Sequence, residues 1–270
     1  MTDASLFVDL AARSEKGSRN ANEDELRCGR IEQGWYAVLA DGAGGHSRGA
    51  EASLRAVQCI EDYLLRHIGA VTPELLTSLV ALAHAELKRH QSGQDLLSDM
   101  HSTLVLLWVD GDGRHALWSH VGDSRLYRLR RGVVDIVTRD DSVVQRMLSA
   151  GLITLEQARG HPQKNQLVAA LGIDGPLEPH TVARPVELLD GDVFLLCSDG
   201  WWEGLDALLL AELLAQSHSP DEWLDHMQHH IEGRRVARQD NFSAIAVWIG
   251  SPAAGLLQAP DDTLPRGLSR

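Results

Sequence analysis

Several acidic residues, distant from one another along the chain, lie at the margins of apolar stretches. They are Glu23 and Asp24 in NANEDE, Asp41 in LADGAGGH, Asp123 in VGDSR, Asp199 in LLCSDGWW and Asp240 in RQDNFS. Glycine follows two of them, so the main chain there can turn sharply and bring its carbonyl groups to a ligand. A single Asp-Gly pair is usually a plain turn. Taken together, these acids predict that packed strands bring carboxylates from remote segments to one place.

Carboxylates gathered in one place repel one another, so their convergence predicts compensating cations. Oxygen ligands without matching Cys or His spacing favour Mg²⁺ or Mn²⁺ over zinc. Two such ions can share a bridging carboxylate and a bridging water, so that hydroxide exists near neutral pH. This chemistry hydrolyses phosphate esters. Arg19, five residues before Asp24, is the candidate for holding two phosphate oxygens in a fork.

The elements that must position these acids alternate between strands and helices. Short apolar runs predict strands over 6–12, 34–39, 102–110, 115–122, 125–130, 133–138, 180–184, 192–200 and 242–250. Apolar residues at helical spacing predict helices over 48–67, from Pro73 onward, over 206–216 and over 220–232, and two short helices after Ser142. The strands between 102 and 138 predict an antiparallel meander. We expect an α+β fold of packed sheets with helices outside.

Composition excludes several classes of protein. A formal net charge of -13 opposes binding to nucleic acid or to an anionic membrane surface. The three cysteines are far apart and lack CxxC spacing, so neither a disulfide framework nor a zinc site is indicated. The N-terminus lacks a signal-peptide pattern and no apolar stretch reaches membrane-spanning length, so we expect a cytoplasmic protein. The predicted organisation is one monomeric domain over 1–250 with a mobile tail over 251–270.

Eight segments, in order and with suitable gaps, resemble the bacterial metal-dependent protein phosphatases of the PP2C (PPM) type. They are GSRNANED (17–24), DGAGGH (41–46), STLVLLWV (102–109), VGDSRLYRL (121–129), VTRDDSVVQRMLSAGLIT (137–154), HPQKNQLVAALG (161–172), GDVFLLCSDGWW (191–202) and RQDNFSAIAV (238–247). The resemblance implies a four-layer α-β-β-α sandwich with metal ions in a cleft at one edge of two mostly antiparallel sheets. It also implies hydrolysis of phosphoserine and phosphothreonine in proteins by a hydroxide that bridges two ions.

The resemblance also assigns roles to individual residues. Asp41 would bridge both ions, and the carbonyl group of Gly42 would complete the coordination of one of them. Asp199 and Asp240 would hold the other ion, while Asp24 would act through bound water.

Three further features follow from the same resemblance. Asp123 would work with Asp199 in a third, weaker metal site. Arg19 falls on the arginine that grips phosphate, in agreement with its position before Asp24. Residues from about 147 to 165, which we call the flap, match a helical segment beside the cleft that is expected to influence the choice of protein substrate. The alternative is that the flap only connects two elements.

Two departures from the family pattern affect the predicted site. Animal relatives have a histidine general acid where this chain has Ala43, so protonation of the leaving group has no assigned residue. His46 is a candidate substitute, although an exposed or capping histidine at a helix start is an equal alternative. Asp141 stands in TRDDS where many bacterial members read DHS, and we expect it to affect substrate tolerance more than the metals.

Two other functions remain open from the sequence. A catalytically silent module that binds phosphoproteins would predict missing ligands, whereas Asp41, Asp199 and Asp240 are all present. A small-molecule phosphatase is the other alternative, because an open cleft also accepts small esters. Resemblance to compact bacterial phosphatases implies a partner pathway with a Ser/Thr kinase, with type VI secretion as one setting.

Overall fold

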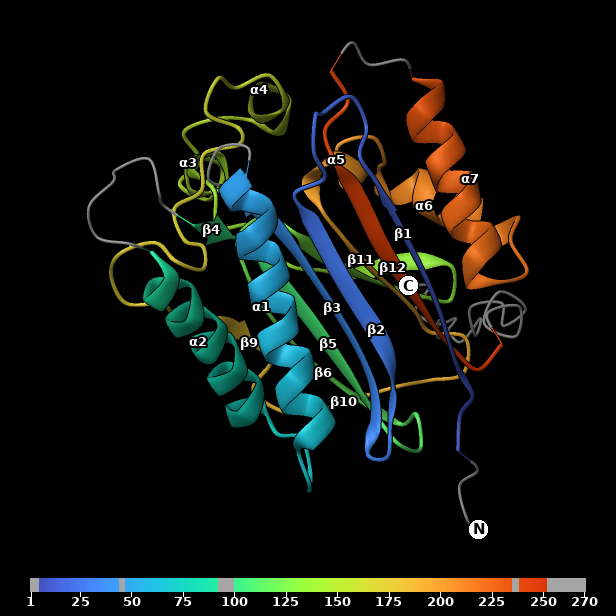
Figure 1. Ribbon diagram of the computed structural model, residues 1–270. Helices are drawn as coiled ribbons and strands as arrows, with labels where there is room; N and C mark the ends of the chain where they lie inside the picture. The colour runs from blue at the N-terminus through green and yellow to red at the C-terminus, as the bar shows by residue number, and fades with distance from the viewer. Residues whose placement is uncertain (1–4, 44–46, 92–99, 235–237, 252–270) are drawn as a thin grey trace, which may run out of the picture.

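Two antiparallel sheets lie face to face, and helices cover their outer faces (Figure 1). The computed structural model describes residues 5–43, 47–91, 100–234 and 238–251. Within these residues the order of elements from one side to the other is helices, a seven-stranded sheet, a five-stranded sheet and helices. The predicted four-layer α-β-β-α sandwich is confirmed. No helix among the described residues combines the length and the apolar character needed to cross a membrane.

The seven-stranded sheet carries two long helices on its outer face. Its described strands are β10 (Val186–Glu187), β6 (His115–Val121), β5 (Leu104–Asp110), β3 (Gly34–Ala43) and β2 (Asp24–Ile31), with β4 (His101–Ser102) on β3 and β9 (His180–Thr181) on β6. The helices are α1 (Ser47–Arg66) and α2 (Pro73–His90). Thr72 caps α2 by accepting a hydrogen bond from the Leu75 N–H, and Pro73 suits the first helical position. Apolar residues of both helices, such as Ile60 and Leu76, are fully buried against this sheet.

The five-stranded sheet is covered by the C-terminal helices. In order its described strands are β1 (Val8–Glu15), β12 (Phe242–Ile249), β11 (Val193–Cys197), β7 (Arg125–Arg130) and β8 (Val133–Val137). The helices are α5 (Asp199–Trp202), α6 (Ala207–Ala215) and α7 (Pro220–Gly233). Trp201 of α5 and Trp223 of α7 are fully buried and pack against the sheet.

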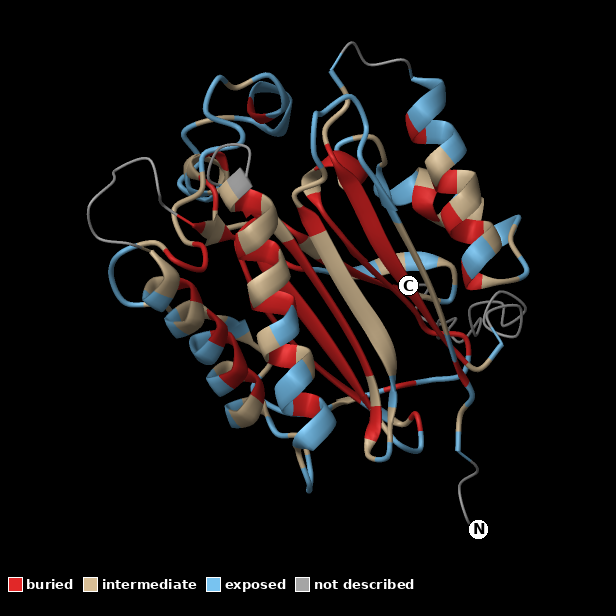
Figure 2. Cartoon of the chain, in the orientation of Figure 1, coloured by how far each residue is buried: buried red, intermediate tan, exposed pale blue. Residues whose placement is uncertain are grey.

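A third apolar cluster fills the space between the sheets. Leu39 and Val105 of one sheet meet Phe194, Leu196 and Ile245 of the other, and all five are fully buried. Figure 2 shows the central strands of both sheets as buried along most of their length. Strands covered on both faces are nearly continuous apolar runs, which explains why β5, β11 and β12 stood out in the sequence.

The predicted meander over 102–138 is wrong, because its second and third strands belong to different sheets. β5 pairs with β6 and β7 pairs with β8, whereas β7 pairs with β11 on its other side. The chain changes sheets at Gly122, whose φ of 96° is unfavourable for other residues. A Cβ atom there would lie 2.7 Å from the Thr103 side chain, so the close packing also requires glycine.

Three strands differ from the expected ones. β2 was not predicted, because Glu25, Arg27 and Arg30 interrupt its apolar residues. The strand expected over 180–184 is reduced to the two residues of β9. The strand expected over 192–200 ends at Cys197, and Asp199 instead begins the short helix α5.

Candidate metal centre

Asp24 and Asp41 lie opposite each other at one end of the β2–β3 pair. The main chain at Asp41 is held by Thr103, whose hydroxyl group accepts from the Asp41 N–H at 2.9 Å and whose N–H donates to the Asp41 carbonyl at 2.8 Å. Asp24 is buried, and its Oδ2 accepts a hydrogen bond from the Ser198 hydroxyl at 2.8 Å. Its Oδ1 is buried and has no hydrogen-bond partner among the described residues. Such an orphaned carboxylate oxygen fits a site that receives an external ligand.

Gly42 allows the end of β3 to pack against the start of α1. Its N–H donates to the Glu23 carbonyl at 3.0 Å. A Cβ atom on Gly42 would lie 2.0 Å from the Gly49 carbonyl oxygen, so a larger residue would force the strand and the helix apart. The glycine that follows Asp41 is therefore required by close backbone approach.

Asp199 and Asp240 reach the same region from the five-stranded sheet. Asp199 follows β11 and Asp240 precedes β12, its neighbour in the sheet. A Cβ atom on Gly200 would lie 2.1 Å from the Asn241 carbonyl oxygen, so the two segments run directly against each other. This contact explains why glycine follows Asp199 as it follows Asp41.

Asn241 fixes the N-terminal loop to this end of the sheet, a role that the sequence did not reveal. Its side-chain amide donates to the carbonyl groups of Lys16 and Ala21 at 2.8 and 2.9 Å. Its Oδ1 accepts from the Glu23 N–H at 2.9 Å, next to Asp24. The Asp-Asn pair in RQDNFS was a signal for a structured turn, but its partners 220 residues away could be identified only in the folded chain.

Asp123 enters from the segment that crosses between the sheets. It is buried, and its carbonyl group accepts a hydrogen bond from Trp202 Nε1 at 2.9 Å. The crossover at Gly122 therefore places an acidic residue beside α5, where Asp199 lies.

The carboxylates perturb one another's protonation. Burial, followed by the charges of Asp24, Asp199, Asp123 and Asp240, raises the pKa of Asp41 well above its ordinary value. Burial raises the pKa of Asp199 in the same way, with further contributions led by Asp123 and Asp240. Mutual effects of this kind place the predicted acids within electrostatic reach of one another.

Two members of the cluster titrate near neutrality. Burial raises the pKa of Asp24 to about 6, against the opposing effect of the nearby Ser243 and Ser198 hydroxyl groups. Burial and the Asp140 charge raise the pKa of Asp123 to about 7.

The predicted acids are widely spaced. Among the described residues, no group of three of these acids has carboxylate oxygen atoms that all lie within 4.8 Å of one another. Buried and half-buried carboxylates that repel one another, one of them with an orphaned oxygen, fit hard divalent cations.

Comparison with known proteins agrees with this geometry. The family description "Protein phosphatase 2C" matches residues 12–239. The chain belongs to the protein phosphatase 2C family. The match covers every described strand except β12 and the start of β1, and all the predicted acids except Asp240, which lies one residue beyond it.

Individual members of the family extend the comparison. The chain is 32% identical over 225 residues to the serine/threonine protein phosphatase PstP of Mycobacterium tuberculosis, covering 81% of this chain but only 42% of that protein. It superposes on the PstP catalytic domain in complex with two manganese ions with a TM-score of 0.77 and 27% identity, covering 92% and 100% of the two chains. A structure described as PppA, a key regulatory component of T6SS in Pseudomonas aeruginosa, gives a TM-score of 0.74 and 31% identity over 92% of this chain and all of that one.

Arg19 lies beside the predicted acids and forms an ion pair with one of them, Asp240. Arg19 Nη2 lies 2.5 Å from Asp240 Oδ2, and the arginine side chain is 59% exposed. Gly17, with φ 59°, brings this loop against the Asp240 carbonyl group. Among the described residues only Nη2 of Arg19 is engaged by an ion pair, so the other guanidinium N–H groups remain available to a phosphate.

The general acid remains an open prediction. Ala43 is exposed at the end of β3, and His46 lies outside the described residues.

The predicted tail begins at Ser251, whose N–H donates to Asp190 Oδ1 at 2.7 Å. The rest of the tail, residues 252–270, lies outside the described residues.

Asp141, the second departure from the family pattern, supports the crossover that carries Asp123. Its Oδ2 accepts from the Gly122 N–H at 3.0 Å, and its own N–H donates to the Gly122 carbonyl at 2.9 Å. Its Oδ1 lies 2.8 Å from His180 Nε2, and the His180 ring stacks on His120. Ser142, the next residue, caps helix α3 (Val143–Ser149) at the start of the flap region. Asp141 therefore connects the segment before Asp123 to the base of the flap.

Proposed function

We propose that this chain is a metal-dependent phosphatase that hydrolyses phosphoserine and phosphothreonine in proteins. One observation carries the proposal. Buried and half-buried acids from both sheets converge at one end of the sandwich, they raise one another's pKa, and Asp24 Oδ1 is left without a partner among the described residues. Family membership and the named activity of PstP support the same reaction class.

Asp41, Gly42, Asp199 and Asp240 are the residues that we propose hold two ions, with Asp24 acting through water. Asp123 is the additional ligand that we propose for a third site. When bound, Mn²⁺ or Mg²⁺ supplies positive charge that offsets the acids and the phosphate and makes water more acidic.

The chain's own groups orient the substrate and the ligands. Arg19, largely exposed beside Asp240, binds phosphate oxygens through its guanidinium fork. The Ser198 hydroxyl holds Asp24 in one orientation, and Thr103 fixes the backbone at Asp41. These hydrogen bonds preorganise the acids before substrate arrives.

A direct assay tests this function. The purified chain with Mn²⁺ should release phosphate from a phosphothreonine peptide, and the Asp199→Asn variant should not. Equal release by both proteins would show that the assigned site is wrong. A chain that binds the phosphopeptide with Mn²⁺ present but never releases phosphate would instead be the silent binding module.

The biological setting that we propose is a bacterial signalling pathway in which this phosphatase opposes a Ser/Thr kinase in the cytosol. Similarity to PppA over its whole length supports a role in type VI secretion. The three cysteines are free thiols, which suits a reducing compartment. We expect a monomer, and sedimentation of the purified chain at micromolar concentration would measure its oligomeric state.

A further inference from the structure

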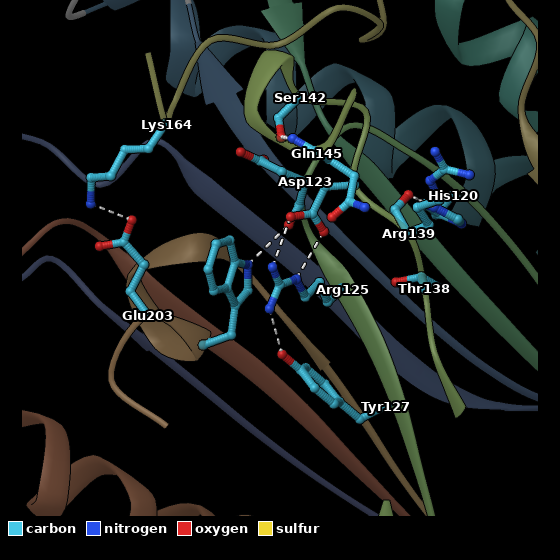
Figure 3. Close-up of polar contacts among 12 residues, drawn as sticks. His120, Asp123, Arg125, Tyr127, Thr138, Arg139, Ser142, Gln145, Lys164 and Glu203 are labelled. Carbon is cyan, nitrogen blue, oxygen red and sulfur yellow. Dashed lines mark hydrogen bonds and ion pairs between the residues drawn. The ribbon is translucent and has the colours of Figure 1, made fainter. Parts of the chain in front are cut away.

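A groove extends from the candidate metal centre to the flap. It has a volume of about 670 Å³, and Asp123 and Asp199 line it together with residues of α3, α4 (Leu155–Arg159), β7, β8, α5 and the start of α6. The groove is therefore continuous with the site at which a phosphate would be cleaved. Figure 3 shows part of its lining, with Lys164 and Glu203 on one side of Asp123 and Ser142 and Gln145 on another.

The floor of the groove is rigid and its charges are internally balanced. Arg125 donates to both carboxylate oxygens of Asp140 at 2.8 Å and to the Tyr127 hydroxyl group at 3.0 Å (Figure 3). Its guanidinium carbon lies 3.5 Å from the centroid of the Trp202 ring, and Trp202 in turn donates to the Asp123 carbonyl. A bidentate ion pair stacked on an aromatic ring leaves little freedom for this surface to rearrange.

The sides of the groove combine exposed apolar side chains with cations. Leu155 of α4 is 65% exposed and Val137 of β8 is 46% exposed, and both line the groove. Arg159 follows Leu155 by one helical turn and has no carboxylate partner among the described residues. The guanidinium group of Arg234, at the end of α7, donates only to the Glu203 carbonyl group, at 3.2 Å, within the described part of the chain. Two uncompensated guanidinium groups therefore face one groove on a chain whose net charge is -13.

Several acidic residues of the groove already contact other groups of the protein. Glu203 pairs with Lys164 at 2.6 Å, and this contact joins the flap to α5. The Asp206 carboxylate caps α6 by accepting from the Leu209 N–H at 2.9 Å. Asp123 and Asp199 belong to the candidate metal centre. Apart from Asp206, which keeps its negative charge at the start of α6, the charges of the groove that have no partner of opposite sign among the described residues are those of Arg159 and Arg234.

We propose that this groove binds the stretch of a phosphoprotein next to its phosphorylated residue, and that Arg159 and Arg234 make it prefer acidic and apolar side chains over basic ones. The proposal rests on the proposed function, since the phosphate group would lie at the Asp123–Asp199 end. Leu155 and Val137 provide the apolar contact, and the two arginines provide charge complementarity.

Matched phosphothreonine peptides test this preference. The three peptides differ only at the positions on either side of the phosphothreonine, which carry Glu, Leu or Lys. The small ester para-nitrophenyl phosphate, which does not extend into the groove, is the reference substrate. We expect kcat/KM to be about tenfold higher for the Glu peptide than for the Lys peptide, mainly through KM, because complementary rim charges favour association. Cleavage of Glu and Lys peptides with equal efficiency would overturn the proposal.

Charge reversal identifies the residues responsible. The double variant Arg159→Glu, Arg234→Glu should lose the preference for Glu peptides or invert it, while hydrolysis of para-nitrophenyl phosphate stays within about twofold. Arg66→Glu, at an exposed position at the end of α1, is the matched control and should leave the preference unchanged. If the double variant slows the small ester as much as the peptides, the arginines do not select substrates and the proposal fails. If the native chain hydrolyses none of these esters with Mn²⁺, the proposed function itself is wrong.

Discussion

Ser198 donates a hydrogen bond to Asp24 across the two sheets, at 2.8 Å and in the buried interior. Asp24 begins β2 of one sheet, whereas Ser198 follows β11 of the other. The same hydroxyl accepts from the Ser243 N–H at 3.0 Å. One side chain thus links both sheets at the end where the acids converge.

Ser198→Ala should destabilise the chain. It removes a hydrogen bond to a buried carboxyl group, so we expect a loss of about 1.5–3 kcal/mol in the free energy of unfolding. Urea unfolding in EDTA measures it. Ser78→Ala, which removes an exposed hydroxyl that bonds its own helix, is the control and should cost less than about 0.5 kcal/mol. Equal effects of the two substitutions would contradict a special role for Ser198.

Asp199→Asn should separate stability from metal binding. Without metal, the variant removes one charge from a repelling cluster, so its melting temperature should rise by about 2–6 °C. With millimolar Mn²⁺ the native chain should gain stability because ions bind only the folded form, and the variant should gain much less. Differential scanning calorimetry with EDTA or Mn²⁺ measures both changes. Asp62→Asn, at an exposed position on α1, should change neither value.

The metal-free chain should become less stable as the pH rises from about 4 to 7. Folding raises the pKa of Asp24 to about 6 and that of Asp123 to about 7, above the ordinary value of about 3.9 in an unfolded chain. In this window the folded chain binds more protons than the unfolded chain, so the free energy of unfolding falls with increasing pH.

Urea unfolding in EDTA at pH 5 and pH 7.5 measures this dependence. The two carboxyl groups should each contribute on the order of 2 kcal/mol to the loss. The Asp123→Asn variant should show a flatter dependence than the native chain. Parallel pH profiles for the two proteins would show that Asp123 ionises normally.

Asp141→Ala should weaken the crossover that carries Asp123. The Gly122 N–H would lose its partly buried acceptor, at a cost of about 1–3 kcal/mol, and the Mn²⁺ concentration for half-maximal activity should rise several-fold. Asp141→Asn keeps an oxygen acceptor for Gly122 and should restore most of the stability. If Ala and Asn variants require the same Mn²⁺ concentration as the native chain, Asp141 does not position the site.

Arg19→Ala should reduce kcat/KM by about 10–100-fold and weaken inhibition by inorganic phosphate, because the bidentate contact to phosphate oxygens is lost. Arg19→Lys keeps the charge but not the fork, so it should fall between the native chain and the Ala variant. Since Arg19 is largely exposed and Asp240 is half-buried, solvent screens their ion pair, and the free energy of unfolding should change by less than about 1 kcal/mol. A large loss of stability would assign Arg19 a structural role instead.

The sequence predicted the helices and strands whose apolar residues recur with strong periodicity, and it pointed to the acidic residues next to the strands. Helices α1, α2, α6 and α7 and strands β5 and β12 lie close to their expected ranges, because their apolar residues are buried on the faces that the pattern indicated. β2 was missed because its charged residues interrupt the alternation, and pairing with β3 decides its structure. Local pattern cannot show a partner that lies elsewhere in the chain.

The acidic residues of the candidate site could be predicted from the sequence, but the residues that support them could not. Asp41 and Asp199 were visible because glycine follows each of them, and the structure shows that both glycines are needed for close backbone contact. Ser198, Thr103 and Asn241 were not visible, because their roles depend on contacts between segments distant in sequence. The sequence also did not show that β6 and β7 belong to different sheets. A turn at a glycine can lead to the next strand of the same sheet or to a strand of another sheet.

The division of the acids between the two sheets has a further consequence. Asp24 and Asp41 belong to strands of one sheet, while Asp199 and Asp240 flank strands of the other. The affinity of the proposed site for cations should therefore depend on how the two sheets are aligned. A change deep in the apolar layer, at Val105 or Leu196 for example, could slide one half past the other and impair ion capture while the protein remains folded.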